Sequence, residues 1–270
     1  MIFDALLQKV FGYLAHKKSA YRLFLRYEEK LRLEQDNFFK DLGLNRGRAI
    51  VRLDQVLKLI YNRNYAENNG MWSEHLVLFS ALSDSNYPVN TILEIGTFNG
   101  ETATILSALF PTSKIHTIDL SFSDILKTSM YKYETNDNKM LTKRNSNLQS
   151  LKNVNFNELN SLALINSQNK YDLIWIDGDH LYPTAAIDIA NSVRLLNEDG
   201  IAVSDDVYIG YGKVQKNGRS GASLQTLLSL SEANLITYTL IHKRIGFFFN
   251  FPRTRKKYLA VIQKNAKNIL

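Results

Sequence analysis

The stretch TILEIGTFNG (residues 91–100) joins a short apolar run to a turn that contains two glycines. β-Branched and apolar residues over 91–95 are typical of a buried strand, and ETATILSAL (101–109), directly after the turn, has the composition of a helix. Glycines between a strand and a helix let the backbone pass close to a ligand, and the amide hydrogens that open the helix can face that ligand. The segment therefore predicts a strand, a turn and a helix with a binding site at the turn.

Four further apolar runs follow along the chain: KIHTIDL (114–120), VNFNEL (154–159), YDLIWID (171–177) and GIAVSDD (200–206). Strands separated by helical stretches indicate a mostly parallel sheet with helices on both faces. NLITYTLIH (234–242), RIGFFFNF (244–251) and KKYLAVIQ (256–263) indicate an antiparallel pairing at the end of that sheet. The predicted fold is α/β and resembles the Rossmann-like arrangement, with a mostly parallel seven-stranded sheet and an antiparallel C-terminal strand pair.

Ahead of the sheet, apolar residues recur at helical spacing from Ile2 to about Asn64, with one break at Gly43 to Gly47. A further helix is predicted from about Ser73 to Leu82. We therefore divide the chain into a helical N-terminal arm or cap (1–69) and a main domain (70–270). Dimerisation is the commonest use of such helices, so we expect a homo-oligomer; docking on membrane-associated machinery and simple cover of the sheet stay open.

Composition excludes several classes of protein. The 270 residues (30.9 kDa) are 45% hydrophobic and 22% charged, which excludes a disordered or collagen-like chain. Cysteine is absent, which excludes disulfides, thiolate metal sites and cysteine nucleophiles. No apolar run reaches the roughly 18 residues of a membrane-spanning helix. The opening residues are interrupted by Asp4, Gln8 and Lys9, unlike a secretory signal, so a cytoplasmic location is expected.

The net charge of +7 is unevenly distributed. Residues 1–60 carry +5, residues 242–270 carry +8, and the centre (61–241) carries −6. Solvated helix faces account for most such charge, and a peripheral contact with an anionic membrane, polymer or nucleic acid stays open. Because the centre is acidic, nucleic acid is not the favoured partner.

Polar residues follow the predicted strands at the sheet edge where ligands of open α/β sheets bind. Asp119 ends the second strand 19 residues after Gly100, where a carboxylate can accept hydrogen bonds from both hydroxyls of a ribose. Each such residue taken alone is equally typical of an ordinary turn. The dinucleotide fingerprint needs glycine where Phe98 and Glu101 stand, and no phosphate-loop GK[ST] is present. A nicotinamide or nucleoside triphosphate is therefore disfavoured.

Taken in order, the acid-x-Gly-x-x-x-Gly turn and Asp119 resemble the class I S-adenosylmethionine-dependent methyltransferases over about residues 70–250. The resemblance implies S-adenosylmethionine as cofactor and 70–270 as the domain that binds it. Relatives often carry an acid at the adenine site, where this chain has Asn160. The implied contacts are Gly96, Thr97 and Gly100 along the methionine part, Glu94 behind the turn, Asp119 on the ribose, and Asn160 and Ser161 beside the adenine.

A second group of titratable residues follows the fourth and fifth strands: Asp177, Asp179, His180, Asp205 and Asp206. Neighbouring carboxylates repel one another unless a cation or a proton intervenes. A hard divalent cation resolves this, because Mg²⁺ takes about six oxygens and three carboxylates leave positions for two oxygens of a substrate. The alternative is that Asp179 or Asp206 only caps a helix or a turn.

This group narrows the resemblance to metal-dependent O-methyltransferases, in particular the methyltransferase family 24 branch that methylates sugar hydroxyls of antibiotics and surface glycans. The resemblance implies that Asp177, Asp205 and Asp206 are the metal ligands and that His180, beside Asp177, is the general base. Catechol-type relatives use a lysine or another carboxylate as base. The implied reaction is methylation of a sugar or another vicinal hydroxyl, in a glycan or natural product, with Mg²⁺ or Mn²⁺ lowering the hydroxyl pKa.

Two further features border this predicted site. The segment 208–223 has four glycines and three basic residues, and we expect it to cover the substrate; a plain surface connection is the alternative. Trp72 and His75 are expected beside the pocket, unless they only pack in the core. The competing functions are a metal-independent N- or O-methyltransferase, an RNA methyltransferase, and a cofactor-binding partner subunit that has lost catalysis.

Overall fold

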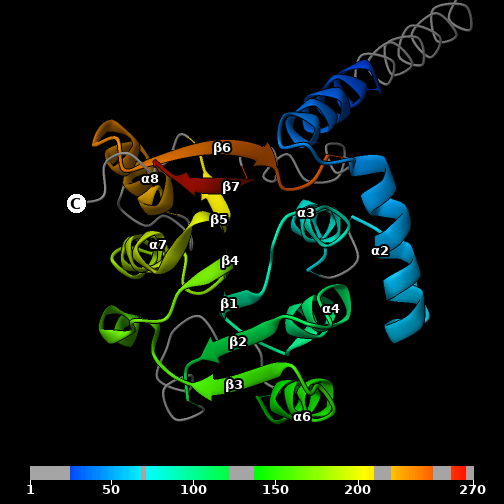
Figure 1. The fold of residues 1–270 in the computed structure, drawn as a ribbon, viewed down its shortest axis with the longest axis vertical. Coiled ribbons are helices and arrows are strands. Elements are labelled where there is room, and N and C mark those ends of the chain that lie inside the picture. Colours follow the sequence, from blue (N-terminus) through cyan, green and yellow to red (C-terminus); the bar gives the residue numbers. More distant parts are fainter. Residues whose placement is uncertain (1–24, 68–70, 122–136, 210–219, 246–256, 266–270) are drawn as a thin grey trace, which may run out of the picture.

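The computed structural model describes residues 25–67, 71–121, 137–209, 220–245 and 257–265 (Figure 1). Their strands form one seven-stranded sheet in the order β3-β2-β1-β4-β5-β7-β6. Apolar and β-branched residues dominate each inner strand, as expected for strands covered on both faces. The strands are β1 (Thr91–Ile95), β2 (Lys114–Asp119), β3 (Val154–Glu158), β4 (Tyr171–Ile176), β5 (Leu196–Tyr208), β6 (Ile236–His242) and β7 (Lys257–Lys264).

Strand pairing confirms the predicted Rossmann-like class. β1 to β5 pair in parallel, and β7 pairs antiparallel with both β5 and β6. The last strand therefore lies between the two that precede it along the chain. After β1 the chain runs outward through β2 to β3 and then returns to the other side of β1 as β4. This reversal next to β1 is the point at which such sheets bind ligands.

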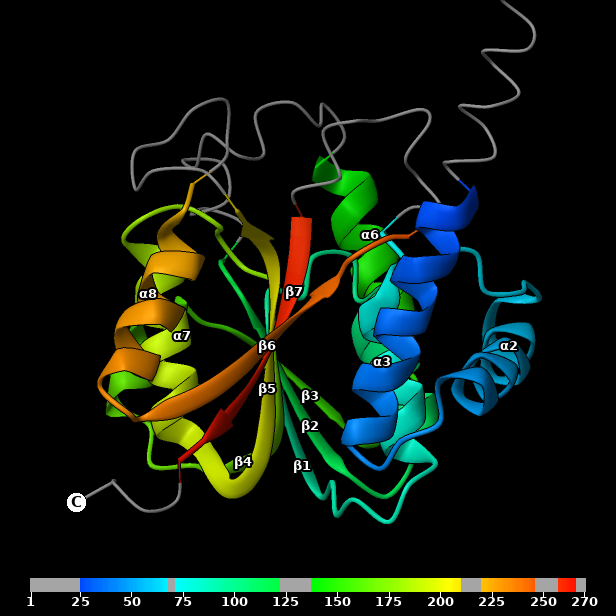
Figure 2. The same cartoon turned by 90° about the horizontal axis from the view of Figure 1, so that it is seen from above.

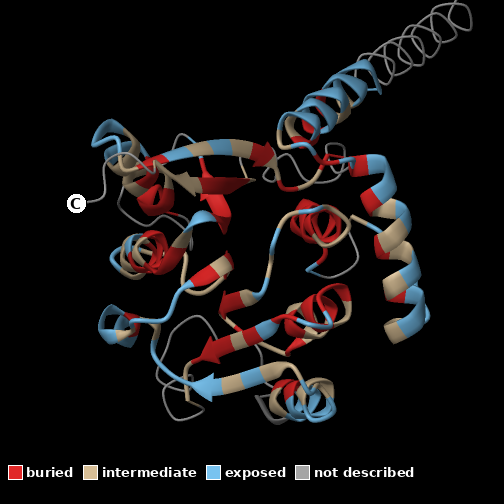
Figure 3. Cartoon of the chain, viewed as in Figure 1, coloured by how far each residue is buried: buried red, intermediate tan, exposed pale blue. Residues whose placement is uncertain are grey.

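Helices cover both faces of the sheet (Figure 2). One face carries α7 (Thr184–Leu195) and α8 (Ala222–Glu232), and the short 3₁₀ helix η2 (Ser161–Asn166) contacts α7. The other face carries α3 (Glu74–Ser83), α4 (Glu101–Leu109) and α6 (Asp137–Leu148), with α2 (Arg46–Tyr61) packed on α3 and α4. Helix α3 is almost wholly buried (Figure 3), and its bounds confirm the helix predicted from Ser73 to Leu82.

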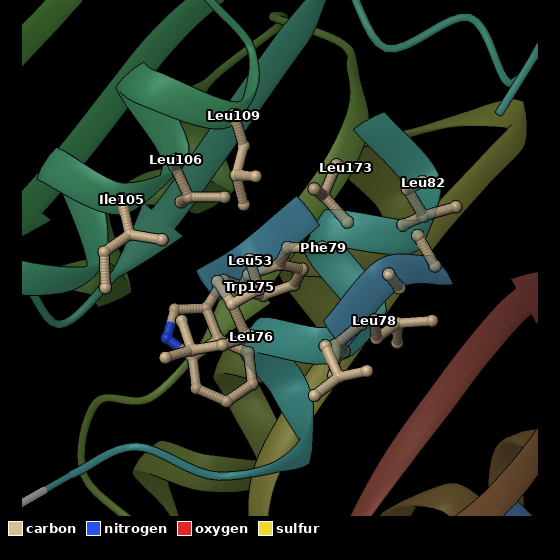
Figure 4. Close-up of a cluster of buried hydrophobic side chains, with 14 of the residues drawn as sticks. Leu53, Leu76, Leu78, Phe79, Leu82, Ile105, Leu106, Leu109, Leu173 and Trp175 are labelled. Atoms are coloured by element: carbon tan, nitrogen blue, oxygen red, sulfur yellow. The ribbon is translucent and has the colours of Figure 1, made fainter. Parts of the chain in front are cut away.

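The sheet separates two hydrophobic cores because neighbouring strand residues point to opposite faces. Trp175 and Phe79 centre the core under α3 and α4, with ring centroids 5.5 Å apart in an edge-to-face arrangement (Figure 4). Ile174, one residue before Trp175, packs instead with Ile189 and Leu227 under α7 and α8. The two cores hold the carboxyl ends of β1 and β4 in fixed positions from both sides.

The predicted N-terminal helices are present in the described part, over residues 25–41 and in α2. The break is shorter than predicted: Gly43 turns the chain with φ 71°, and α2 already begins at Arg46, so Gly47 is helical. The Asn45 side chain caps α2 by accepting a hydrogen bond from the Arg48 amide. Leu53 and Leu57 of α2 belong to the core around Trp175. Helix α2 is therefore continuous with the main body through its core.

No helix in the described ranges has the length and apolar character needed to cross a membrane. The predicted cover over 208–223 falls mainly on residues 210–219, and most of RIGFFFNF falls on 246–256. Both predictions concern residues outside the described ranges.

Candidate active site

A first cavity of about 260 Å³ opens at the carboxyl ends of β1, β2 and β4. Four residues predicted to bind a cofactor line it. Gly96 follows β1, Asp119 ends β2, and Asn160 and Ser161 lie after β3 at the N-terminus of η2. We call it the nucleoside cavity, because the predicted ribose and adenine residues meet there. Its lining includes Gly96, Phe98, Asp119, Asn160, Ser161, Asp177, Gly178, Asp179 and Thr184.

Asp119 is held at the end of β2 by backbone amides. Its Oδ2 accepts a hydrogen bond from the Phe98 amide at 2.7 Å, and its Oδ1 accepts one from the Leu120 amide at 2.8 Å. Burial raises the pKa of Asp119, against the lowering effect of those amides and of Arg144, whose Nη1 lies 3.9 Å from Oδ2. Each carboxylate oxygen accepts more than one hydrogen bond, so Asp119 keeps capacity for the hydroxyls of a ribose.

Asn160 and Ser161 stand where the resemblance implies the adenine border. The Asn160 side chain accepts a hydrogen bond from the Leu162 amide at 3.0 Å and so caps η2. Both residues line the nucleoside cavity across from the turn after β1. The amide group that caps η2 thus fixes the wall of the cavity at that position.

Gly96 has a left-handed backbone with φ 99°, and its hydrogen faces the next strand of the sheet. A Cβ atom there would lie 2.2 Å from the Asp177 carbonyl oxygen, far inside any allowed contact. The protein's own backbone therefore requires this glycine, which brings the turn after β1 against the residue that ends β4. Gly100 (φ 76°) starts α4 outside both cavities, where a Cβ would contact Leu148 of α6 at 3.1 Å.

Glu94 lies behind the turn and is fully buried. Its Oε2 accepts a hydrogen bond from the Thr117 hydroxyl at 2.5 Å, and the hydroxyls of Thr117 and Thr97 are 2.6 Å apart. Burial raises the pKa of Glu94 to about 8. The group links the middle of β1 to β2 beneath the cavity, and it is neutral at pH 7.

A second cavity of about 470 Å³ continues from the first. The two share Gly96, Phe98, Asp177 and Gly178, so they adjoin at the turn after β1. We call it the acceptor cavity, because it also holds the predicted base. Its remaining lining is Met71, Trp72, His75, Thr97, Asn99, Glu101, Thr102, Ile105 and His180.

Trp72 and His75 border this cavity, as the sequence predicted. Trp72 donates its indole N–H to Glu101 Oε1 at 3.2 Å. His75 stacks on Trp175 with ring centroids 4.5 Å apart, and its Nδ1 lies 2.7 Å from the Ser73 hydroxyl. Burial lowers the pKa of His75 to about 3, so this imidazole is neutral and forms a rigid wall of the cavity.

Three predicted residues converge beside the acceptor cavity, which two of them, Asp177 and His180, line. Asp177, His180 and Asp205 each offer a ligand atom, and these atoms all lie within 4.8 Å of one another. His180 Nε2 is 3.5 Å from Asp177 Oδ1. Burial raises the pKa of Asp177, and the negative charge of Asp205 raises it further. Asp205 Oδ1 is buried and has no hydrogen-bond partner among the described residues, so the group can accept one small hard cation.

A β-bulge aims Asp205 and Asp206 at the same neighbour. The pairing of β5 with β7 shifts register between Ser204 and Val207, and Asp206 has a left-handed backbone with φ 48°. In a regular strand two consecutive side chains point to opposite faces, and a bulge breaks that alternation. The bulge lets both carboxylates reach Lys243, which directly follows β6.

Two lysines neutralise this acidic pair. Lys243 Nζ lies 2.5 Å from Asp205 Oδ2 and 2.7 Å from Asp206 Oδ1, and Lys257 Nζ lies 2.6 Å from Asp206 Oδ2. Burial alone would raise the pKa of Asp205 and Asp206, but the Lys243 ammonium holds both pKa values below their usual range. The same pairs raise the pKa of Lys243 against the lowering effect of its own burial.

The three residues brought together therefore differ from the predicted ligand set of Asp177, Asp205 and Asp206. The group that the structure brings together contains His180 beside Asp177 and Asp205. Both oxygens of Asp206 instead accept hydrogen bonds from lysines. Asp179, for which a cap of a helix or a turn was the alternative interpretation, lines the nucleoside cavity and accepts a hydrogen bond from the Leu181 amide.

Sequence reasoning missed Lys243 and Lys257. Both were counted within the basic charge of residues 242–270, whose ordinary interpretation is solvated surface. Lys243 is in fact only 4% exposed. The available signal was position, because Lys243 directly follows the predicted segment 234–242 and Lys257 lies at the start of the predicted segment 256–263.

The mostly parallel sheet, its switch point beside β1 and the two adjoining cavities there define a Rossmann-like protein with a candidate ligand site at the strand ends. Residues 93–207 match the family model described as a methyltransferase domain. These residues run from β1 to the bulge in β5 and include both predicted sets of site residues, whereas Lys243 and Lys257 lie beyond the match. The chain is an S-adenosylmethionine-dependent methyltransferase.

Solved structures with the same fold cover most of the chain. Cofactor-bound Rv0187 from MTB is 18% identical with a TM-score of 0.53, over 82% of this chain and 89% of that one. The O-methyltransferase from Bacillus cereus, in complex with SAH, is 14% identical with a TM-score of 0.51, over 79% and 91%. The SAH-bound Podospora anserina methyltransferase PaMTH1 is 16% identical with a TM-score of 0.50, over 80% and 87%. The search of curated proteins gave no match.

Proposed function

We propose that this methyltransferase transfers the methyl group of S-adenosylmethionine to a hydroxyl oxygen of a small-molecule or glycan acceptor. The observation that carries the proposal is the wall of Gly96, Asp177 and Gly178 shared by the two cavities. With the nucleoside in the first cavity, the sulfonium reaches this wall. An acceptor in the second cavity then meets the methyl group beside Asp177 and His180.

The cofactor is expected to bind with its ribose hydroxyls on Asp119 and its adenine beside Asn160 and Ser161. The methionine part continues past Gly96 toward Thr97. Glu94 acts beneath the turn by holding Thr117, not by direct contact with the cofactor. Gly100 serves the packing of α4 on α6.

A divalent cation, Mg²⁺ by donor type, fits between Asp177 and Asp205, because both side chains offer hard oxygen ligands within 4.8 Å of each other. When bound, such a cation lowers the pKa of a coordinated hydroxyl. Asp206 is left out of this ligand set, since Lys243 and Lys257 occupy its oxygens.

His180 is the proposed general base. Its Nε2 lies 3.5 Å from Asp177 Oδ1 at the edge of the acceptor cavity, and its unprotonated imidazole can take the hydroxyl proton. The acceptor oxygen forms a bond to the methyl carbon as the carbon–sulfur bond breaks. The electron pair of that bond stays on sulfur, and S-adenosylhomocysteine leaves. The side chains around the cavity chiefly align the oxygen with the carbon–sulfur bond.

The lining of the acceptor cavity favours an uncharged, ring-shaped acceptor such as a sugar with vicinal hydroxyls. Trp72 gives a flat apolar wall, and Asn99 and Glu101 give hydrogen-bonding groups. The described lining contains acids but no lysine or arginine. A phosphate-rich acceptor such as RNA is therefore disfavoured, in agreement with the acidic centre of the sequence.

The test is a panel of glycosides with vicinal hydroxyls, incubated with protein, S-adenosylmethionine and Mg²⁺, with release of S-adenosylhomocysteine as the readout. We expect His180→Gln to lower turnover by about 10² to 10⁴. Its affinity for S-adenosylhomocysteine by calorimetry should stay within about threefold, because the residue stands outside the nucleoside cavity. Unchanged turnover in His180→Gln contradicts the proposed base.

Metal-independent methyl transfer is the second candidate, and the two lysines favour it, since they already neutralise Asp205 and Asp206. The chelator EDTA separates the two candidates. Loss of turnover in EDTA, restored by Mg²⁺, supports the metal-dependent reaction. Full turnover in EDTA supports the second candidate.

A further inference from the structure

We propose that Lys243 is a built-in competitor for the divalent cation of the proposed site, so that the cation binds weakly and only when the Lys243 ammonium yields Asp205. This inference rests on the metal-dependent form of the proposed function. It assigns to Lys243 a role that the sequence pattern did not indicate. In this role, Lys243 sets the affinity of the site for its cation.

Lys243 and the cation would compete for the Asp205 carboxylate, whose two oxygens have different surroundings. Oδ2 lies 2.5 Å from Lys243 Nζ, whereas Oδ1 has no hydrogen-bond partner among the described residues. Oδ1 is therefore the oxygen that a cation shared with Asp177 can use. A cation bound there lies on the same carboxylate as a buried ammonium, and two positive charges at such separation repel strongly in a poorly hydrated site.

The ammonium is fixed in this place by the backbone. The Lys243 carbonyl accepts a hydrogen bond from the Glu74 amide at 3.0 Å, and the Lys243 amide donates to the Lys257 carbonyl at 3.4 Å. Glu74 is itself held by the buried Arg46, whose Nε lies 2.5 Å from Glu74 Oε1. The backbone of Lys243 is thus hydrogen-bonded to the first residues of α3 and β7. Because the residue is only 4% exposed, its side chain has little room to turn toward solvent.

Lys257 offers a matched comparison within the same cluster. It pairs with Asp206 Oδ2 at 2.6 Å, whereas Lys243 pairs with Oδ1, and its Nζ lies 5.3 Å from the centroid of the Tyr208 ring. Its side chain is 23% exposed, against 5% for Lys243. The two lysines carry the same charge and lie near the same bulge, but only Lys243 contacts a carboxylate of the proposed cation site.

The experiment measures Mn²⁺ binding to the full chain by electron paramagnetic resonance, for the parent, Lys243→Met and Lys257→Met. We expect Lys243→Met to bind Mn²⁺ at least about tenfold more tightly than the parent, because removal of one buried positive charge frees both oxygens of Asp205. Lys257→Met should bind within about threefold of the parent. Equal affinities for Lys243→Met and the parent overturn the inference and leave the metal site itself intact.

Lys243→Met also leaves two buried carboxylates without their partner, so the variant is expected to be less stable than the parent in EDTA. Mn²⁺ should then raise its melting temperature by more than it raises that of the parent, because the cation replaces the lost charge and binds only the folded state. The double variant Asp205→Asn, Lys243→Met should lose that gain. A gain that persists in the double variant means that the Mn²⁺ binds elsewhere, and overturns the inference.

A result in which neither the parent nor Lys243→Met binds Mn²⁺ removes the metal from the proposed function and the inference with it. Turnover in EDTA, measured on the same samples, then shows whether methyl transfer itself survives.

Discussion

The two halves of the sheet edge treat their carboxylates in opposite ways. At the ends of β1 and β2, Asp119 is buried and is satisfied by the Phe98 and Leu120 amides. Near the end of β5, Asp205 and Asp206 are buried and pair with the side chains of Lys243, directly after β6, and Lys257, at the start of β7. A backbone donor is supplied by the local turn, whereas a side-chain donor must be supplied by the fold.

The difference suits the two tasks. An amide cannot move away from Asp119 without unfolding the turn, so the predicted ribose contact is permanent. The partners of Asp205 and Asp206 belong to side chains, so under the proposal above a cation can compete with one of them. Asp119 therefore has a setting fixed by the local turn, and the acidic pair is expected to have one that can change. The following variants test this contrast.

The largest effect is expected from Gly96→Ala, which forces the two halves apart. The new Cβ would lie 2.2 Å from the Asp177 carbonyl oxygen, in a left-handed backbone. Overpacking and backbone strain together should cost about 4 kcal/mol, a large part of the stability of a typical domain. Urea denaturation measures the loss.

Gly43→Ala is the control for this variant. Gly43 has a similar left-handed backbone with φ 71°, but nothing lies within 4 Å of its Cβ position. It should cost about 1–2 kcal/mol, the strain of the backbone alone. Equal losses in the two variants would show that the close approach of β1 to Asp177 is not what requires the glycine.

Glu94→Gln tests how the buried carboxyl beneath the nucleoside cavity makes the stability of the protein depend on pH. The pKa of Glu94 rises from 4.5 in the unfolded chain to about 8 in the folded protein, so between these values the folded state holds a proton that the unfolded chain releases. Stability therefore falls as pH rises through this window and is lowest above pH 8. The glutamine variant lacks this penalty. Its stability relative to the parent should grow by on the order of 3 kcal/mol from pH 5 to pH 9.

Thermal melts of the two proteins across that pH range measure the effect, with Glu232→Gln, on the exposed end of α8, as the control. A constant difference in stability between Glu94→Gln and the parent would mean that Glu94 is ionised in the folded protein at neutral pH.

Asp119→Asn should weaken binding of S-adenosylhomocysteine by about 10- to 100-fold, the usual cost of removing a charged hydrogen-bond partner. The amide keeps one acceptor oxygen but loses the second, so the hydroxyls and the Phe98 amide compete for it. Calorimetry at pH 7.5 measures the affinity. Glu158→Gln on the neighbouring β3 is the control, since Glu158 is also an acid beside Arg144 but is half exposed. Unchanged affinity in Asp119→Asn would place the ribose elsewhere.

The smallest effect is expected from Asp179→Asn. The Asp179 side chain accepts one hydrogen bond from the Leu181 amide at 3.1 Å, and an asparagine oxygen can accept the same bond. Stability should change by less than about 0.5 kcal/mol, and turnover should stay within about threefold. A loss of turnover as large as that of His180→Gln would give Asp179 a direct part in the reaction.

The sequence predicted those parts of the molecule that depend on local pattern. The strands, the turn at Gly96 and the positions of Asp119 and Asp177 at strand ends follow from apolar runs that stop at polar residues. Lys243 could not be predicted in this way, because it lies 38 residues after Asp205 and reaches it only through the strand order β5-β7-β6. The left-handed backbone of Asp206 was equally hidden, since nothing in SDD marks a bulge.

The reasons for some predictions also changed. Gly96 was predicted for close approach to a ligand, and the structure shows that the Asp177 backbone already requires it. The repulsion expected among the acids was real, but the lysines relieve part of it. A sequence pattern can thus indicate the correct residue while the cause lies in a contact that only the fold creates.

The place of β7 between β5 and β6 has a consequence for the newly made chain on the ribosome. Until residues 257–264 have been synthesised, the outer edge of β5 has no partner, and Asp206 has no Lys257. An open edge of this kind invites pairing with other chains. The nascent protein is therefore most exposed to aggregation just before β7 pairs with β5, and a chaperone that shields β5 during that interval should raise the yield of folded protein.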